Sequence, residues 1–257
     1  MSAAVATSRM GTEASGLALT FVAGSCSLSC GGCPIDAMKE IAREDTSPGF
    51  DPARLIPKPL DLESKKVELS PDCFVRFADD IGERYEIGKL LMQGFEPLHP
   101  HTLPYTITLM RYGANEGIPE IGFITNGQQW YDDYIAECAE MGVSITISLN
   151  SDHDSMHDST RGSIPIPTQH KLEEPGILQV EGPFLRTNAF IKNTVNTYLK
   201  YHSPERVKDL LTISSVLFSP KTANDLLEFP EFIQFEYGLT NIVFNLFKLQ
   251  HILQMEL

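Results

Sequence analysis

Three cysteines stand within eight residues of one another, and their spacing indicates a metal centre. Cys26, Cys30 and Cys33 form a C-x3-C-x2-C group, and the only other cysteines of the 257-residue chain are Cys73 and Cys138. Structural zinc sites and ordinary electron-transfer iron–sulfur clusters take four protein ligands. Three close thiolates without a fourth nearby therefore predict a metal centre that keeps one coordination position open. An open position is where a metal centre does chemistry.

The composition indicates a globular protein of a reducing compartment. Its 42% hydrophobic residues are ordinary for a globular chain, and no run approaches the roughly 18 apolar residues of a membrane span. The 20 basic and 34 acidic residues give a net charge of −14, which repels phosphate backbones and argues against nucleic-acid binding. Five cysteines, three of them crowded, favour metal-bound thiolates over disulfides. We therefore expect a cytoplasmic protein without membrane or nucleic-acid partners.

Short apolar runs alternate with helical patterns along the chain. The predicted strands are 17–24, 87–93, 120–125, 143–149, 211–217 and 242–247. The predicted helices are 35–43, 73–83, 102–116, 130–141 and 186–201. This alternation predicts an α/β fold, either a parallel sheet or a partial barrel. In such folds ligands bind at the carboxyl ends of the strands. The cysteine loop, residues 94–97, Asn126 and Asn150 all follow predicted strand ends, so we expect them on one polar rim.

Four motifs, taken in order, resemble those of the radical S-adenosylmethionine (radical SAM) enzymes. They are the C-x3-C-x2-C loop, Gly-Phe-Glu-Pro at 94–97, Ile-Thr-Asn-Gly at 124–127, and Ser-Leu-Asn at 148–150 with His-Asp-Ser-Thr-Arg-Gly at 157–162. The resemblance covers residues 17–247 and implies a partial (β/α)6 TIM-like barrel with helices outside. Residues 1–16 are then expected to be a disordered tail, and 248–257 a short C-terminal tail.

The resemblance also implies two cofactors and the residues that hold them. Cys26, Cys30 and Cys33 would ligate a [4Fe–4S] cluster whose fourth iron binds S-adenosylmethionine. Glu96, with the backbone of Gly94 and Phe95, would accept hydrogen bonds from the methionine ammonium. The other implied cosubstrate contacts are Ser148, Asn150 and Asn126 near the ribose, Arg161 at the carboxylate, and Gly32 near the adenine. Two positions depart from the family pattern: Gly32 is often aromatic there, and Phe95 replaces a glycine.

The reaction implied is reductive cleavage of S-adenosylmethionine to a 5′-deoxyadenosyl radical, which takes a hydrogen atom from a small polar substrate. The electron would come from a donor such as flavodoxin or ferredoxin. No cysteine follows Cys138, so we expect no second cluster and a redox-neutral outcome: isomerisation, epimerisation, rearrangement or elimination, as in biosynthesis. The alternatives are a glycyl-radical-enzyme activase, or a noncatalytic iron–sulfur or zinc protein in which Cys73 or a histidine completes the site.

Three further features allow two interpretations each. Cys73 is a candidate hydrogen-atom donor, although simple packing is the default for a cysteine near a helix start. His153 and His157 stand among aspartates and could bind a second metal, but a solvated loop is the expected reading. The Pro-rich insertion 163–183 is either a lid over the site or a plain surface loop.

Overall fold

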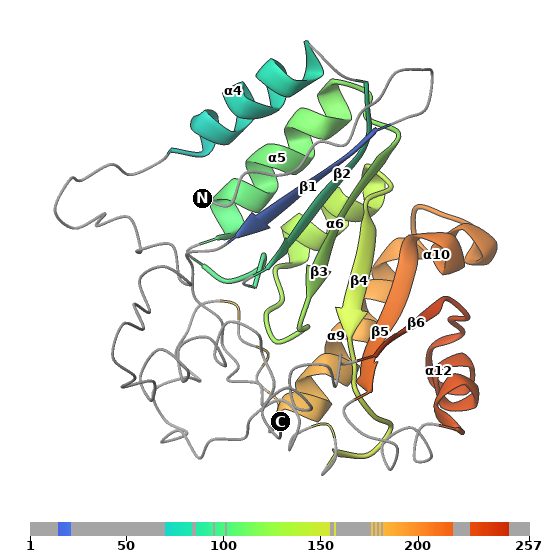
Figure 1. Cartoon of the computed structure of the whole chain (residues 1–257). Helices are drawn as coiled ribbons and strands as arrows, with labels where there is room; N and C mark the ends of the chain where they lie inside the picture. The colour runs from blue at the N-terminus through green and yellow to red at the C-terminus, as the bar shows by residue number, and fades with distance from the viewer. Residues whose placement is uncertain are drawn as a thin grey trace, which may run out of the picture. The chain divides into compact units, whose positions relative to one another are not determined.

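Figure 1 shows the computed structural model on which the description rests. The structure describes residues 15–21, 70–83, 86–94, 96–100, 102–154, 157, 176, 178, 180, 182–217 and 227–246. Some of the predicted features lie outside these residues. They are the cysteine loop with Gly32, the helix at 35–43, Phe95, Arg161, most of the insertion 163–183, the tail 248–257 and most of the tail 1–16.

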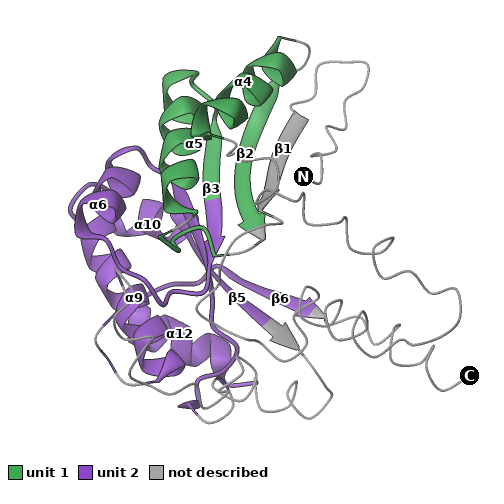
Figure 2. Ribbon diagram, turned by 90° about the vertical axis from the view of Figure 1, so that its left-hand side faces the viewer, with its two compact units in different colours: residues 1–122, 159–175 green, residues 123–158, 176–257 purple. Residues whose placement is uncertain are grey.

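The chain divides into two compact units, which Figure 2 shows in different colours. The first consists of Met1–Gly122 and Ser159–Pro175, and the second of Phe123–Asp158 and Gly176–Leu257. Unit 1 carries β1 (Ser15–Phe21), α4 (Pro71–Gly82), β2 (Ile87–Gly94), α5 (Leu103–Asn115) and the start of β3 (Glu120–Thr125). Unit 2 carries the end of β3, then α6 (Asp132–Glu140), β4 (Ser144–Ser148), α9 (Pro183–Tyr198), α10 (Pro204–Leu210), β5 (Leu211–Leu217), α12 (Phe229–Tyr237) and β6 (Ile242–Leu246).

The strands follow one another in chain order, from β1 to β6, in an open sheet. The pairs β1–β2, β4–β5 and β5–β6 are parallel, with Leu19 beside Met92, Ile147 beside Ile213, and Ser214 beside Val243. Parallel neighbours need crossover connections, which the helices supply. Within unit 1, α4 and α5 lie on one side of the strands, and within unit 2, α6 and α9 do (Figures 1 and 2). The predicted α/β class, a partial TIM-like barrel with parallel strands and outer helices, is confirmed.

The core of unit 1 lies between α5 and the strands β2 and β3. Its fully buried side chains include Leu90, Met92, Leu109 and Met110. Gly113 of α5 faces this core, where a Cβ atom would lie 3.0 Å from Ile121 and 3.1 Å from Leu90. Glycine therefore lets the helix approach the strands closely. α4 packs on α5 through Phe74 and Tyr105, whose rings meet edge to face with centroids 5.4 Å apart.

The core of unit 2 lies between the strands and the helices α6 and α9. The fully buried apolar residues of these elements include Ile135, Ile145, Ile147, Phe190, Ile191, Leu211 and Ile213. Polar groups are also buried there, and among them the hydroxyl of Tyr198 donates to the carbonyl of Val143 at 2.7 Å. Burial raises the pKa of Tyr198 well above its usual value, so the phenol remains a neutral donor.

Most element boundaries agree with those predicted from the periodicity. β3 and β5 begin and end at the predicted residues. β1 begins at Ser15 rather than at residue 17, and α9 begins at Pro183 rather than at 186. The earlier start of α9 follows from local chemistry, because Gly182 has φ +82° and Pro183 suits the first helical position.

Two helices of unit 2 were not predicted. α10 follows Ser203, whose side chain accepts the Arg206 backbone N–H at 3.3 Å, so a Ser-Pro helix start was present in the sequence. α12 ends at Gly238, which takes the left-handed conformation with φ +70°. Among the described residues, no helix is long and apolar enough to cross a membrane.

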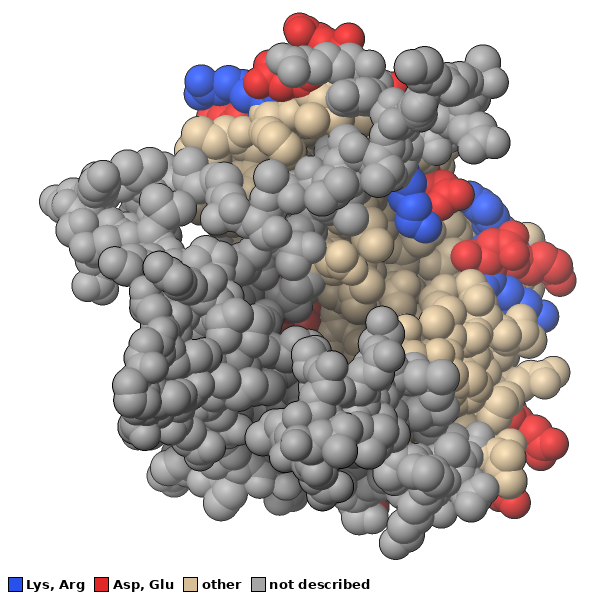
Figure 3. Space-filling model, viewed as in Figure 1, with Lys and Arg blue, Asp and Glu red and all other residues tan. Residues whose placement is uncertain are grey.

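Charged side chains of both signs are interspersed on the described surface. On the face in Figure 3, Lys and Arg lie close to Asp and Glu and form no continuous basic area in the described part. Lys89 and Glu120, for example, are paired at 3.0 Å across β2 and β3. On this face, the described residues therefore provide no basic track for a phosphate backbone.

Candidate active site

The loop after β2 holds a buried carboxylate in unit 1. Gly94 ends β2, and the side chain of Glu96, only 3% exposed, accepts the Leu98 backbone N–H through Oε1 at 3.1 Å. The Glu96 carbonyl in turn accepts the backbone N–H of His99 at 3.1 Å and the hydroxyl of Thr102. These bonds fix the carboxylate at the carboxyl end of β2, the edge where ligands bind in this class of fold.

The loop after β3 is built around Asn126 in unit 2. Asn126 is 6% exposed, and its Oδ1 accepts the backbone N–H of Gln128 at 2.9 Å across Gly127, which has φ +69°. The Asn126 carbonyl accepts the Thr187 hydroxyl at 3.0 Å and Nε2 of Gln128 at 3.3 Å. The side-chain oxygen of Asn126 therefore builds the turn, in the manner typical of asparagine.

The loop after β4 is fixed at Asn150, also in unit 2. Ser148 ends β4 and is half-buried, and Asn150 is 4% exposed. The backbone N–H of Asn150 donates to Nδ1 of His157 at 3.1 Å, and its carbonyl accepts the Ser215 hydroxyl at 3.2 Å. The main chain of Asn150 is thus held from both sides.

The expectation of a solvated loop is confirmed for His153, which is exposed, and is wrong for His157. This side chain is fully buried, because Nδ1 accepts the Asn150 N–H and the ring packs against Phe184 with centroids 5.8 Å apart. An accepting Nδ1 requires the neutral imidazole with its proton on Nε2. His157 therefore positions the loop after β4.

The structure places the described candidates at strand carboxyl ends. Glu96 follows β2 in unit 1; Asn126, Ser148 and Asn150 follow the neighbouring strands β3 and β4 in unit 2. The remaining candidates, Cys26, Cys30, Gly32, Cys33, Phe95 and Arg161, lie outside the described residues. Within the described ranges no group of three His, Cys, Asp or Glu is arranged to hold a metal ion.

The two remaining cysteines occupy helices. Cys73 is the third residue of α4, half-buried, with Sγ 3.7 Å from the Ser70 hydroxyl. Cys138 of α6 is fully buried, and burial raises the pKa of its thiol well above the usual range. Cys138 is therefore a protonated packing residue, as expected.

Sequence reasoning missed several polar residues around the β3 loop. Gln128 donates its amide to the Thr187 hydroxyl at 2.9 Å and to the Pro183 carbonyl at 3.1 Å. Gln129 is fully buried beside it. Both glutamines directly follow the Ile-Thr-Asn-Gly motif, and this position could have identified them from the sequence. Thr187 lies 59 residues beyond Gln128, and no sequence pattern links the two.

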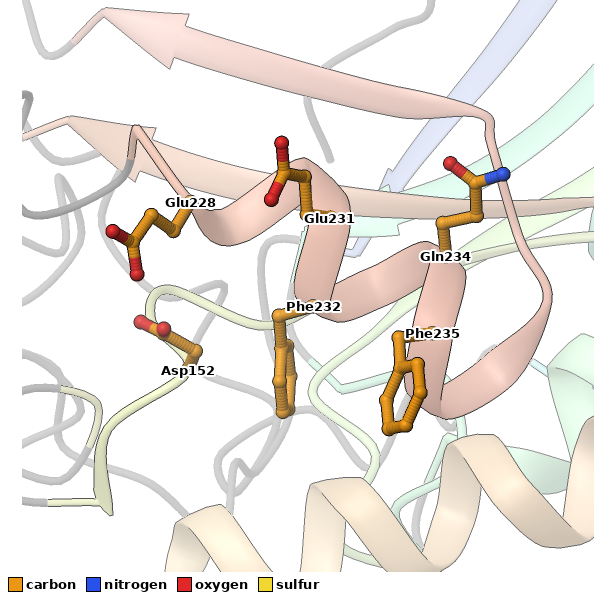
Figure 4. A pocket seen from close by; sticks show the side chains of 6 residues that line it. All are labelled: Asp152, Glu228, Glu231, Phe232, Gln234 and Phe235. Carbon is orange, nitrogen blue, oxygen red and sulfur yellow. The ribbon is translucent and has the colours of Figure 1, made fainter.

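A surface pocket of about 820 Å³ lies in unit 2 between α12 and the loop after β4 (Figure 4). Its lining consists of Asp152, Glu228, Glu231, Phe232, Gln234 and Phe235. Phe232 and Phe235 extend from the same side of α12, and Phe235 is 87% exposed. Carboxylates beside aromatic rings form a lining that suits organic cations.

No protein-family model matches the chain, and neither does any curated protein. Solved structures do match. Native anSMEcpe with bound AdoMet and Kp18Cys peptide is 14% identical, with a TM-score of 0.53, and the match covers 90% of this chain and 51% of that one. The structure with the Cp18Cys peptide is 13% identical, with a TM-score of 0.52, and the coverages are 90% and 50%. A histidine-tagged anSMEcpe with bound AdoMet is 15% identical, with a TM-score of 0.50, and the coverages are 89% and 49%.

These neighbours are structures of an anaerobic sulfatase-maturating enzyme, which is a radical SAM enzyme. The chain spans about half of their length. At such low identity the likeness concerns the fold alone. The chain therefore has the fold of the radical SAM enzymes.

Proposed function

We propose that the protein is a radical SAM enzyme that binds one [4Fe–4S] cluster and S-adenosylmethionine and takes a hydrogen atom from a small polar substrate. One observation carries the proposal. In a fold shared with AdoMet-bound structures, the motif residues Glu96, Asn126 and Asn150 follow the carboxyl ends of β2, β3 and β4. Residues scattered by chance along the chain would not follow successive strand ends in the family's order.

The residues present suit both cofactors. Three thiolates from Cys26, Cys30 and Cys33 form a soft, anionic donor set of the kind that iron–sulfur clusters use. When bound, the reduced cluster supplies the electron for cleaving S-adenosylmethionine. In unit 1 the buried Glu96 carboxylate offers a charged acceptor to the methionine ammonium, worth about 1.5–3 kcal/mol. In unit 2, Ser148 and Asn150 supply hydrogen-bonding groups for the ribose.

The protein's own contribution is to position the reactants and keep water away from them. Hydrogen bonds to the main chain of Glu96 and Asn150 hold the two loops that carry these residues. An electron donor such as flavodoxin or ferredoxin completes the system. We propose a redox-neutral outcome, which needs no second centre to accept an electron from the substrate.

The test uses anaerobically reconstituted protein with dithionite and S-adenosylmethionine. The wild type should show the cluster's visible absorption and release 5′-deoxyadenosine. Glu96→Gln should keep the cluster but weaken S-adenosylmethionine binding by about 10- to 100-fold. Glu120→Gln is the matched control, because this carboxylate is exposed at the start of β3, and it should bind like the wild type. A wild type with a full cluster and no 5′-deoxyadenosine would contradict the proposal.

Deuterated candidate substrates then identify the reaction, because deuterium recovered in 5′-deoxyadenosine marks the hydrogen that was taken. The same assay tests Cys73. If Cys73 returns a hydrogen atom to the substrate, Cys73→Ala will leave 5′-deoxyadenosine formation intact and stop product formation. Unchanged product would make Cys73 a packing residue of α4.

A further inference from the structure

Gln129 is a fully buried amide that makes no hydrogen bond to the described part of the chain. Its side chain is 0% exposed, and neither Nε2 nor Oε1 has a partner among the described residues. Buried polar side chains are hydrogen-bonded in the large majority of cases, so an amide with both ends unbonded calls for a physical reason. A bound ligand that supplies the missing partners is such a reason.

The neighbours of Gln129 determine the direction of its side chain. Gln128 is bonded to Thr187 of α9 at 2.9 Å, and the Trp130 ring meets Phe190 of α9 edge to face, with centroids 5.6 Å apart. Residues 128 and 130 therefore both face α9. Successive side chains of an extended segment point to opposite sides, so Gln129 points away from the helix layer.

The backbone around Gln129 is held in this extended form. Trp130 N–H donates to the Gly176 carbonyl at 2.7 Å, and Leu178 N–H donates to the Gln128 carbonyl at 3.1 Å. These two hydrogen bonds lie on either side of Gln129 and form one antiparallel bridge between the two segments. The amide therefore cannot turn towards α9 to find partners without breaking the bridge.

The polar side chains of this loop make different hydrogen bonds. Asn126, one of the predicted cosubstrate contacts, accepts the Gln128 backbone N–H through Oδ1. Gln128 is anchored to α9 through Nε2. Gln129 is the residue of the loop whose donor and acceptor are both available.

We propose that Gln129 is a ligand-binding residue of the candidate active site, and that its carboxamide bonds a hydroxyl-bearing group of the ligand. A hydroxyl both donates and accepts, and a pair of neighbouring hydroxyls satisfies both ends of one carboxamide. The two sources of such a group are the ribose of S-adenosylmethionine and a hydroxylated substrate. This inference rests on the proposed function and adds to it a residue that no motif contains.

The test variant is Gln129→Met, which keeps the length and volume of the side chain and removes the amide. Without ligand the variant should melt at a higher temperature than the wild type, because no unbonded amide remains buried at this position. Its affinity for S-adenosylmethionine, by anaerobic titration calorimetry, should fall by about tenfold or more if the ribose is the partner. If the substrate is the partner, deuterium transfer from a panel of sugars and polyols should fall instead.

Thr194→Val is the matched control. Its hydroxyl lies in α9, is fully buried and also lacks a partner among the described residues, so this variant should melt higher while binding and transfer stay unchanged. Gln129→Leu repeats the test if the methionine variant does not fold. Unchanged affinity together with unchanged transfer overturns the role of Gln129. A wild type that binds no S-adenosylmethionine overturns the proposed function as well, which separates the two failures.

Discussion

The hydroxyl of Thr187 in α9 donates to the carbonyl of Asn126 at 3.0 Å, although 61 residues separate the two along the chain. The same hydroxyl accepts Nε2 of Gln128 at 2.9 Å. One buried threonine thus ties the loop after β3 to the helix that covers unit 2. The position of this loop, which carries Asn126 and Gln129, depends on that connection.

Replacing Thr187 by valine tests this connection. The change keeps the shape of the side chain and removes two buried hydrogen bonds, one at the Asn126 carbonyl and one at the Gln128 amide, so the free energy of unfolding should fall by about 1–3 kcal/mol. Urea unfolding followed by circular dichroism measures it. Thr194→Val serves again as the control, because its hydroxyl has no partner to lose within the described ranges and its unfolding free energy should not fall. Equal losses in the two variants would show that the hydroxyl bonds of Thr187 contribute nothing.

Gly176 should not tolerate any side chain. It has φ +80°, and a Cβ atom there would lie 2.3 Å from Cζ of Tyr131. Gly176→Ala should cost roughly 2–4 kcal/mol, combining the left-handed backbone with the clash. Gly117→Ala, at φ +68° with no atom of the described residues within 4 Å, should cost only about 1–2 kcal/mol. Thermal melts compare the stabilities of the two variants. Combining Tyr131→Ala with Gly176→Ala should restore the part of the lost stability that is due to the clash.

Two buried tyrosine hydroxyls with different hydrogen bonding allow a matched comparison of two variants. The Tyr198 hydroxyl donates to the Val143 carbonyl, whereas the buried Tyr237 hydroxyl has no hydrogen-bond partner in the part of the chain that the structure describes. Tyr198→Phe should therefore lower the free energy of unfolding by about 1–2 kcal/mol, and Tyr237→Phe should leave it unchanged or raise it slightly. Chemical denaturation of both variants measures the difference. A larger loss for Tyr237→Phe would contradict the hydrogen-bond assignment.

Tyr112 should make unit 1 sensitive to alkali. Burial raises its pKa from 10.0 to about 12, with smaller contributions from the hydrogen bond and charge of Asp79 and from Glu116. Because the folded pKa is the higher one, this contribution to stability is complete below pH 10 and is lost as pH rises towards 12. Tyr112→Phe should show a shallower loss over that range. Absorbance of the phenolate in folded protein, compared between wild type and variant, gives the titration directly.

Local patterns determined the class of fold. Strands β3 and β5 were predicted to the residue, because their apolar runs end at clear breaks such as Asn126-Gly127. The same patterns placed Glu96, Ser148 and Asn150 at or just beyond strand ends. In parallel α/β folds such positions share an edge of the sheet, so their general place followed from the order of elements alone.

Tertiary structure decided which polar groups are engaged and which are available. Asn126 and Gln129 both carry amides in one short loop, yet one builds a turn and the other lies buried without a partner among the described residues. The difference depends on α9, whose Thr187 and Phe190 hold the residues flanking Gln129, and on the bridge to Gly176. These contacts join segments that lie far apart in the sequence, and hydrophobic periodicity, being local, carries no information about such pairings.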